Sequence, residues 1–295
     1  MSDRTTASAG SYLAILASAL LFSTGGAAIK SAALTSWQVA SLRSGVGALA
    51  LLVLLPGARR RINPRIFVTA SMLGTTLLLF VHANKLTTAA NTIFLQSTAP
   101  LWILALAPRL LGEKPGRDDV IYTALLALGA VTFFLGMQTP FATAPDPSTG
   151  NLLALASGLT WALALMGLRW VQWGDSDPAG AAGATVVWAN LLACLAALPA
   201  ALPIEAAGPA DLAVIGYLGV FQIGAAYALM TRAVRRLRAL EVSLFMLLEP
   251  VASSLWAWWI HGERPGPWAL GGGTLILGST AWRAVRGSRA RGAAS

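Results

Sequence analysis

The chain has 295 residues, of which 56% are apolar and only 11% are charged. Soluble domains carry about 25% charged residues, so this chain has too few charges to cover a water-facing surface of its size. The composition excludes an ordinary soluble protein, and the net charge of +9 has to be interpreted in a lipid environment.

Hydrophobic stretches follow one another along the whole sequence. A helix needs about 20 mostly apolar residues to cross the hydrocarbon core of a bilayer. The first stretch lacks the strongly basic leader of a signal peptide and is longer than its apolar region, so we interpret it as a helix. The sequence therefore predicts an all-α integral membrane protein with ten transmembrane helices, at residues 12–30, 36–56, 66–86, 90–111, 119–138, 150–170, 181–203, 210–231, 240–261 and 267–285.

The basic residues lie almost entirely on one side of the predicted membrane. With ten spans, both termini share a side with every second loop, and that side holds 17 Lys and Arg residues against 3 on the other. Cytoplasmic loops carry such an excess. We therefore expect a multi-pass protein of the bacterial cytoplasmic (inner) membrane with cytoplasmic N- and C-termini. The same distribution argues against nucleic acid as a partner.

Two segments repeat without a gap at an offset of 150 residues. Residues 74–116 and 224–266 are identical at 10 of 43 positions, and both end in a similar phrase, "GEKPG" and "GERPG". Helices 1 and 6 match less closely at an offset of 139, as "LAILASALLF" (13–22) against "LLALASGLTW" (152–161). We therefore expect two five-helix repeats, residues 1–138 and 139–295.

Because five is odd, the second repeat must enter the membrane inverted relative to the first. Inverted repeats around a central site are typical of secondary transporters, whose halves can exchange conformations. The repeated phrase is interpreted as a helix–helix joint, in which Gly ends one helix and Glu stands near the positive end of the next helix. A direct transport role for Glu113 or Glu263 is the alternative.

With these features the sequence resembles a known family. The blocks "AANTIFLQSTAPLWILALAPRLLGEKPG" and "ALEVSLFMLLEPVASSLWAWWIHGERPG" are similar to the paired blocks of the drug/metabolite transporter superfamily, in its EamA-type branch of ten-helix exporters. "LFSTGGAAIK" in helix 1 and Arg43 in helix 2 also fit. Aromatic amino-acid exporters of the YddG type are similar in length and layout. The resemblance implies a basket of helices around a central cavity, without an ATPase domain.

Two prolines indicate helices that face this cavity. Pro100 and Pro250 occupy equivalent positions near the middle of the fourth and ninth spans. A mid-helix proline removes a backbone hydrogen bond and kinks the helix. The freed carbonyls are tolerated beside protein or water but not beside lipid. We therefore expect both helices to face the cavity, with a simple packing kink as the alternative.

Polar and aromatic stripes supply candidate binding residues. Helix 3 carries Ser71, Thr75, His82 and Lys85 on one face, and this face is expected to point inward. Other stripes combine aromatic rings with hydroxyl groups, which suits a flat apolar ligand with a polar head. Tryptophans near helix ends, such as Trp268, are instead expected to anchor the membrane interface. The candidate substrate-binding residues are His82, Trp102, Trp161, Thr98, Ser18, Phe22, Ser157 and Phe245.

Charged side chains within the spans need protein or water around them. Arg43 and Glu249 each lie inside a predicted helix, where a charge costs at least about 2.5–3.5 kcal/mol. Together with His82, they are candidates for a proton or charge role. An Arg43–Glu249 pair is one arrangement. In the alternatives, Arg43 snorkels outward or braces the helices, and Glu249 serves the common fold.

The favoured function is a secondary transporter that exports small metabolites, with amino acids, aromatic or neutral, as the expected substrates. An exporter of a drug, nucleoside or sugar derivative and a passive channel remain alternatives. An enzyme is not expected, because no catalytic constellation appears and the only two histidines lie in different halves. The single cysteine, Cys194, excludes a cysteine metal cluster, and no cofactor is expected. The expected partners are the small-molecule substrate and membrane lipid, and a monomer is expected to suffice, although a dimer is possible.

The charge distribution makes a topology prediction. A single cysteine introduced at Arg61, after replacement of Cys194, should remain unlabelled by an impermeant thiol reagent added to intact cells and react once the membrane is permeabilised. Reaction in intact cells would contradict the cytoplasmic position of this loop.

Overall fold

A computed structural model of the chain describes residues 9–110, 116–135, 140, 142–205, 207–234, 236–237, 242 and 245–292, without the side chains of residues 107, 110, 284 and 287–292. No β-strand occurs in these residues. The first half contains α1 (Ala9–Ser23), α2 (Gly25–Ser31), α3 (Ser36–Leu54), η1 (Pro56–Ala58), α4 (Pro64–Leu86), α5 (Ala89–Gln96), α6 (Ala99–Leu110) and α7 (Arg117–Leu135). The second half contains α8 (Pro147–Gln172), α9 (Pro178–Ala201), α10 (Pro209–Tyr217), the π-helical segment η2 (Leu218–Ala225), α11 (Ala226–Val234), α13 (Leu248–His261) and α14 (Pro267–Gly292).

Eight helical stretches in the described residues are long and apolar enough to cross a membrane, and they coincide with the first eight predicted spans. The ninth and tenth predicted spans correspond to α13 and α14. α13 covers 14 residues of the ninth span, and residues 240, 241, 243 and 244 of that span lie outside the described residues. α14 ends in a segment rich in arginine. The prediction of an all-helical membrane protein is confirmed.

Several predicted spans are interrupted rather than continuous. The first is divided at Thr24 into α1 and α2, and the fourth is divided at Ser97 and Thr98 into α5 and α6. Pro100 is the second residue of α6, and Pro250 is the third residue of α13. In the first turn of a helix the missing N–H of proline has no intrahelical partner to lose. In place of the expected mid-helix kink, the fourth span has a break, and Pro100 follows just after it.

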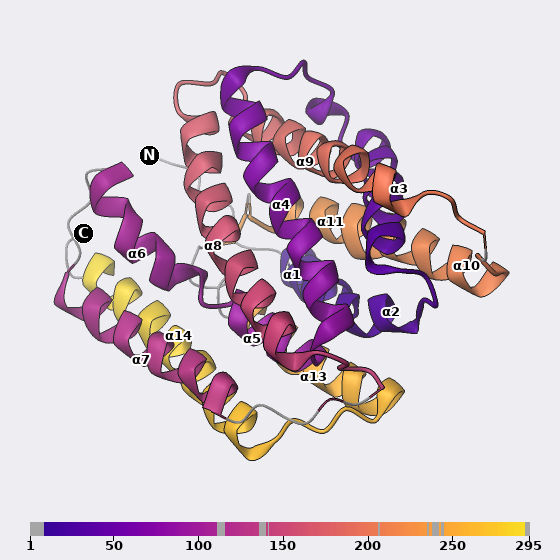
Figure 1. Cartoon of the computed structure of the whole chain (residues 1–295). Helices are drawn as coiled ribbons and strands as arrows, with labels where there is room; N and C mark the ends of the chain where they lie inside the picture. Colours follow the sequence, from indigo (N-terminus) through magenta and orange to yellow (C-terminus); the bar gives the residue numbers. More distant parts are fainter. Residues whose placement is uncertain are drawn as a thin grey trace.

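The packing of the helices is reciprocal between the two halves (Figure 1). α4 of the first half packs against α8 and α9 of the second half. Its counterpart in the second half, the α10–η2–α11 span, packs against α1 and α3 of the first half. α5 and α6 contact α8, just as α13 contacts α1 and α2. Two pairs are self-reciprocal, α3 with α9 and α7 with α14. This pattern is expected of two inverted repeats related by a two-fold axis.

Two repeat-related glycines allow one of these reciprocal approaches. A Cβ atom on Gly74 would lie 3.0 Å from the carbonyl oxygen of Ala189 in α9, and one on Gly224 would lie 2.8 Å from Cβ of Ala50 in α3. α3 and α9 are counterparts in the two halves. The Gly74/Gly224 identity in the sequence repeat thus reflects the same helix crossing made twice.

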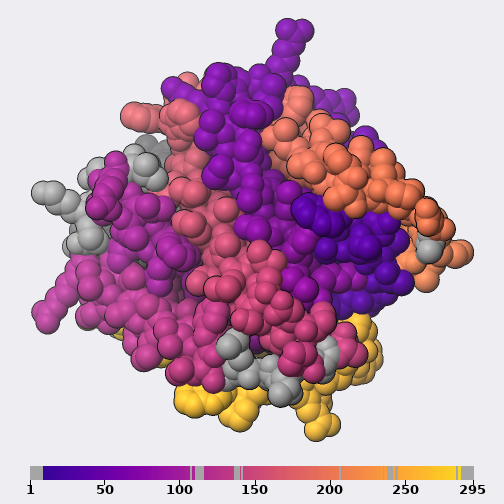
Figure 2. Space-filling view, viewed as in Figure 1, coloured from indigo at the N-terminus to yellow at the C-terminus, as the bar shows by residue number. Residues whose placement is uncertain are grey.

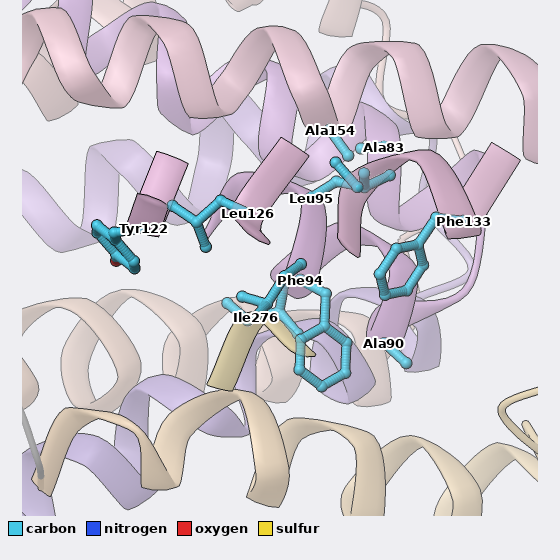
Figure 3. Close-up of a cluster of buried hydrophobic side chains, with 11 residues drawn as sticks. Ala83, Ala90, Phe94, Leu95, Tyr122, Leu126, Phe133, Ala154 and Ile276 are labelled. Carbon is cyan, nitrogen blue, oxygen red and sulfur yellow. The ribbon is translucent and has the colours of Figure 1, made fainter. Parts of the chain in front are cut away.

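A hydrophobic cluster joins the outlying pair α7 and α14 to the rest of the bundle (Figure 3). Phe94 from α5 packs against Phe133 from α7, with ring centroids 5.7 Å apart. Leu126 from α7 and Ile276 from α14 are fully buried in the same cluster. The self-reciprocal α7–α14 pair is therefore attached through α5, and Figure 1 shows it along one edge of the molecule.

Apolar side chains also cover much of the outer surface. Figure 2 shows α4 and α8 side by side over the centre of one face. Large exposed apolar residues occur on many of the spans, among them Leu49, Leu128, Leu152, Leu195 and Leu255. A water-facing surface of this kind would aggregate, whereas lipid accepts it. The surface agrees with the membrane setting that the composition predicts.

On the side where the sequence places most basic loops, an ion-pair cluster connects the two halves. Arg60, between α3 and α4, pairs with Asp175 at 2.9 Å and with Asp177 at 3.0 Å, both between α8 and α9. The indole N–H of Trp188 donates to the carbonyl of Arg60 at 3.0 Å. The backbone N–H of Asp177 and the Arg60 guanidinium hold the pKa of Asp175 below its usual value. These partly exposed pairs hold two loops together but bury little charge.

The second copy of the repeated joint differs from the expectation in one respect. Gly262 ends α13 in the left-handed conformation, with φ of 67°, as predicted for a helix-ending glycine. Glu263 does not lie at the N-terminus of the next helix in the chain, α14. Its carboxylate instead accepts the N–H of Ala89, the first residue of α5, at 2.9 Å. The first copy, with Glu113, lies outside the described residues.

The glycine crossings make a stability prediction. Gly74→Leu and Gly224→Leu should each lower the free energy of unfolding by about 1–3 kcal/mol, because the new side chain is forced into a filled interface. Gly216→Leu is the matched control, since a Cβ there meets nothing within 4 Å. Melting temperatures of the purified variants in detergent measure the effect. Equal melting temperatures for all three would contradict the proposed close packing.

Candidate functional site

A cavity of about 190 Å³ lies in the middle of the bundle, between the two halves. Both halves contribute side chains to it, from α1, α3, α4, α5, α8, η2, α11, α13 and their junctions. The residues that line it are Phe22, Arg43, Leu73, Leu77, Phe80, Ile93, Gln96, Ser97, Trp161, Gln222, Ile223, Tyr227, Met230, Met246 and Glu249.

The wall of this cavity repeats with the sequence. At the offset of 139, Phe22 corresponds to Trp161, and both line the cavity. At the offset of 150, four more pairs of lining residues correspond: Leu73 with Ile223, Leu77 with Tyr227, Phe80 with Met230, and Gln96 with Met246. The cavity therefore lies on the axis that relates the two repeats, which is where alternating access requires a substrate site.

Three polar residues of the cavity, Arg43, Gln222 and Glu249, do not follow this symmetry. At the same offset Gln222 corresponds to Met72 and Glu249 corresponds to Ala99, and neither counterpart lines the cavity. The third of these polar residues, Arg43, lies in α3. Mostly apolar residues thus form a wall that both halves share, and Arg43, Gln222 and Glu249 give it a direction.

Arg43 is a buried cation without a carboxylate partner among the residues that the structure describes. The whole residue is 1% exposed. One guanidinium nitrogen donates to Oε1 of Gln222 and another to the carbonyl of Leu77, both at 3.5 Å. Nε has no partner among the described residues. Since burial of a poorly paired charge is costly, the guanidinium is left with capacity to bind an anion in the cavity. It does not snorkel outward.

Glu249 lies in the first turn of α13 and also faces the cavity. No ion pair joins it to Arg43, although both residues are described, so the two charged groups remain separate. Tyr227, which lines the cavity near Glu249, packs edge-on against Phe22 with ring centroids 5.0 Å apart. A ligand in the cavity would therefore meet a cation, a carboxyl group and aromatic rings.

Gln222 reaches the cavity because the eighth span is π-helical at this point. η2 packs tightly on the first half: a Cβ on Gly25 would lie 2.9 Å from the Gln222 amide, and one on Gly219 would lie 2.5 Å from Val46. Such π-helical turns are frequent at functional sites. Here the widened helix turns Gln222 towards Arg43 of α3.

The break between α5 and α6 forms another part of the wall. Gln96, the last residue of α5, and Ser97, in the break, line the cavity. The Gln96 amide donates to Oγ of Ser157 in α8 at 3.3 Å. Gly158 lets α8 approach, because a Cβ there would lie 3.1 Å from the carbonyl oxygens of both Leu95 and Gln96. As expected from the two prolines, the fourth and ninth spans both face the cavity.

Four of the sequence-predicted residues line the cavity directly, namely Phe22, Trp161, Arg43 and Glu249. Ser157 contacts it through Gln96. The structure places Ser18, Thr98, Trp102, His82 and Phe245 outside the lining. Ser18 donates to the carbonyl of Ala226 at 2.9 Å, and Thr98 donates to that of Leu95 at 2.6 Å. These two hydroxyl groups hold the backbone around the cavity.

The remaining three predicted residues contact other parts of the protein. Nδ1 of His82 bonds the carbonyl of Leu78 at 2.8 Å, and its ring packs edge-on against Trp37 at 4.3 Å. Phe245 packs against Tyr12 at 5.8 Å. Trp102 lies in α6, and its indole N–H has no partner in the part of the chain that the structure describes. A role of these residues in substrate binding remains a prediction.

The polar stripe of helix 3 does not face the cavity. Leu73, Leu77 and Phe80 do so, from the opposite side of α4. The hydroxyl of Ser71 bonds the carbonyl of Phe67, and that of Thr75 bonds the carbonyl of Ser71. A hydroxyl that bonds its own helix is satisfied without an outside partner, so it can face a non-polar environment. The expectation that this stripe points inward was wrong for this reason.

Sequence reasoning missed Gln222 and most of the apolar lining. The repeat itself was the signal that could have found the lining, because it relates Leu73, Leu77 and Phe80 to three residues of the eighth span. The position of Gln222 in the wall depends on the π-helical turn of η2, which changes the residues that share one face of the helix. No pattern in the sequence indicates such a turn.

The comparisons with known proteins agree with this architecture. The family model for the EamA-like transporter family matches twice, at residues 9–135 and 148–283, so the chain belongs to this family and consists of two copies of its repeat. No protein with a curated description matches. A crystal structure of a protein with 20% sequence identity superposes with a TM-score of 0.62, covering 92% of this chain and 95% of that chain. This likeness supports the fold.

The cavity wall makes a prediction about transport. Trp161→Ala and Phe22→Ala should raise the half-saturating substrate concentration by roughly tenfold, since the loss of an aromatic contact of about 1.4 kcal/mol has this effect. Transport into proteoliposomes at matched protein content measures it. Trp268→Ala is the control, because this residue is 53% exposed on α14 and should change little.

Trp102→Ala and His82→Ala decide how far the binding site extends. If both residues bind substrate, as the sequence predicts, their variants should match Trp161→Ala. Unchanged transport would restrict binding to the cavity wall. Unchanged transport by Trp161→Ala and Phe22→Ala would contradict the assignment of the cavity itself.

Proposed function

We propose that this member of the EamA-like transporter family is a secondary transporter that exports small metabolites, with neutral or aromatic amino acids as its substrates, by alternating access. The observation that carries the proposal is the separation of Arg43 and Glu249 in one cavity. Because no ion pair joins them, a zwitterion can place its carboxylate on the guanidinium and its ammonium on the carboxyl group. The side chain of an amino acid would then rest against Phe22, Trp161 and Tyr227.

The size of the cavity supports a small substrate. Pockets that enclose drug-sized ligands have volumes of roughly 300–1,000 Å³, whereas this cavity measures about 190 Å³. The charges favour an amino acid over a nucleoside or a sugar derivative, because those solutes would leave Arg43 and Glu249 without partners of opposite charge. They remain the second choice, since Gln222 and Gln96 could bond hydroxyl groups.

The arrangement favours a carrier over an enzyme or a passive channel. The family is one of transporters, and the cavity holds no nucleophile beside a base and no group of carboxylates. The mostly apolar wall, with phenylalanine, methionine and leucine side chains, is a poor lining for a continuous aqueous pore. We place the protein in the bacterial inner membrane as a monomer, with both termini in the cytoplasm, as the asymmetric distribution of basic loops indicates.

A transport assay with substrate analogues tests this proposal. Proteoliposomes should take up phenylalanine saturably and without ATP, and should prefer it to phenethylamine, which lacks the carboxylate, and to phenylpropionate, which lacks the ammonium group. Arg43→Gln should reduce the preference over phenethylamine, and Glu249→Gln the preference over phenylpropionate. Each loss should be about tenfold or more, because a hydrogen bond to a charged group contributes about 1.5–3 kcal/mol.

Other results would assign a different function. Saturable transport of uridine but of no amino acid would favour the nucleoside alternative. Uptake that does not saturate with any of these solutes would favour a channel. Equal effects of Arg43→Gln and Glu249→Gln on phenylalanine and both analogues would contradict the zwitterion orientation.

A further inference from the structure

A buried ion pair ties the two halves together away from the basic side of the bundle. Nζ of Lys30, in the last turn of α2, lies 2.8 Å from Oε1 of Glu263, in the joint between α13 and α14. Both side chains are only 3% exposed. Figure 1 shows α2 next to α13 at this end of the molecule. The pair is far more buried than the Arg60 cluster on the opposite side.

Each member of the pair also holds the backbone of other segments. Lys30 donates to the carbonyl of Thr87, between α4 and α5, at 2.7 Å, and also to that of Thr143, just before α8. Glu263 accepts the N–H of Ala89 with its second oxygen. The two charges therefore fasten four segments together, two from each half of the chain.

The route from the cavity towards this ion pair is filled by further contacts between the halves. Thr24, at the α1–α2 break, bonds the hydroxyl of Tyr217 at 2.9 Å, and the indole of Trp256 donates to Oγ of Ser23 at 3.0 Å. His261, at the end of α13, bonds the carbonyl of Ala27 at 2.8 Å. The contacts continue from Ser23, directly after the cavity residue Phe22, up to the ion pair.

Stability alone is a weak reason for such a pair. The desolvation of two buried charges offsets most of their attraction, so apolar residues of similar volume often serve as well. A buried pair does, however, specify one arrangement of the groups it joins. When the segments separate, water can solvate both charges, so the separated state is also accessible. This behaviour suits a contact that forms and breaks.

We propose that Lys30 and Glu263 form the outer gate of the transporter, closed in this structure and open when the cavity faces the outside. The identification of this side as the outer one rests on the orientation given under the proposed function. In the closed state the pair joins α2 and the α4–α5 joint to the α13–α14 joint. Opening requires that the ion pair and the two backbone contacts between the halves, Lys30 with Thr143 and Glu263 with Ala89, break together.

Accessibility of a cysteine behind the gate tests the proposal without any knowledge of the substrate. In a protein with Cys194→Ala, Ser253→Cys provides one thiol. Ser253 is 3% exposed, and it lies on α13 between the cavity residue Glu249 and the gate. An impermeant maleimide added to intact cells should label it slowly. Lys30→Met and Glu263→Gln should each increase the rate by roughly tenfold, a typical coupling between two conformations.

Arg60→Gln is the matched control, because it breaks a pair that also joins the halves but lies on the opposite side. It should not increase the labelling rate. The exchange of the two charges in Lys30→Glu/Glu263→Lys should restore part of the protection. Rapid labelling of the parent, or an equal rate in Lys30→Met, Glu263→Gln and the parent, would overturn the proposal.

A second measurement covers variants that fold poorly. In Lys30→Cys/Glu263→Cys, a short thiol-reactive cross-linker should stop transport of whichever solute the parent carries, and a reducible linker should allow recovery with reductant. Full transport by the cross-linked protein would overturn the gate even if the labelling results agreed with it. Failure of phenylalanine transport in the parent, with gated labelling intact, would instead contradict only the proposed substrate.

Discussion

The rest of this structure depends on one constraint: a five-helix unit used twice in one chain must cross the membrane once in each direction. The two units can then bury their apolar faces only against each other about an axis in the membrane plane. The main contacts between unlike spans accordingly occur twice, as α4 with α9 and as η2 with α3. The cavity lies on this axis, and five pairs of its lining residues are related by the two sequence offsets. A site built in this way can, by symmetry, be opened from either side.

The two-fold symmetry lets the site open to either side of the membrane. The same symmetry cannot select one orientation of a ligand. An axis would give a substrate two equivalent poses, and a zwitterion would meet the same group at both ends. The polar residues break this equivalence. The repeat-related counterparts of Arg43, Gln222 and Glu249 do not line the cavity. Of these three residues, Arg43 brings a cation and Glu249 a carboxyl group. In the proposed mechanism the apolar wall serves alternation and the two charges serve recognition, so substitutions in the two sets should have different consequences.

Much of the fold could be predicted from the sequence, because lipid imposes long apolar helices and the repeat imposes their order. The ends of the first eight spans follow from apolar length, and the positions of Phe22, Trp161, Arg43 and Glu249 in the cavity wall follow from their depth. Helix faces were harder to predict. The stripe of Ser71 and Thr75 is polar by composition, yet both hydroxyl groups bond their own helix. Gln222 depends on a π-helical turn, which apolar periodicity does not reveal. Trp102, His82 and Phe245 show that an aromatic side chain at the right depth need not reach the axis.

The repeated joint shows how one sequence phrase can serve both structure and function. Gly262 ends a helix, as its position predicts. Glu263 turns back into the bundle, where its carboxylate accepts the N–H of Ala89 at the start of α5 and pairs with the ammonium of Lys30. At the two offsets Lys30 corresponds to Arg169 and Glu263 to Glu113, so the sequence also assigns a base and an acid to the opposite side. A closed gate must be strong enough to exclude water from the cavity. It must also be weak enough that the free energy of substrate binding and release can separate the halves. A buried pair whose attraction nearly equals its desolvation cost meets both requirements, whereas an apolar contact of the same area would be harder to open.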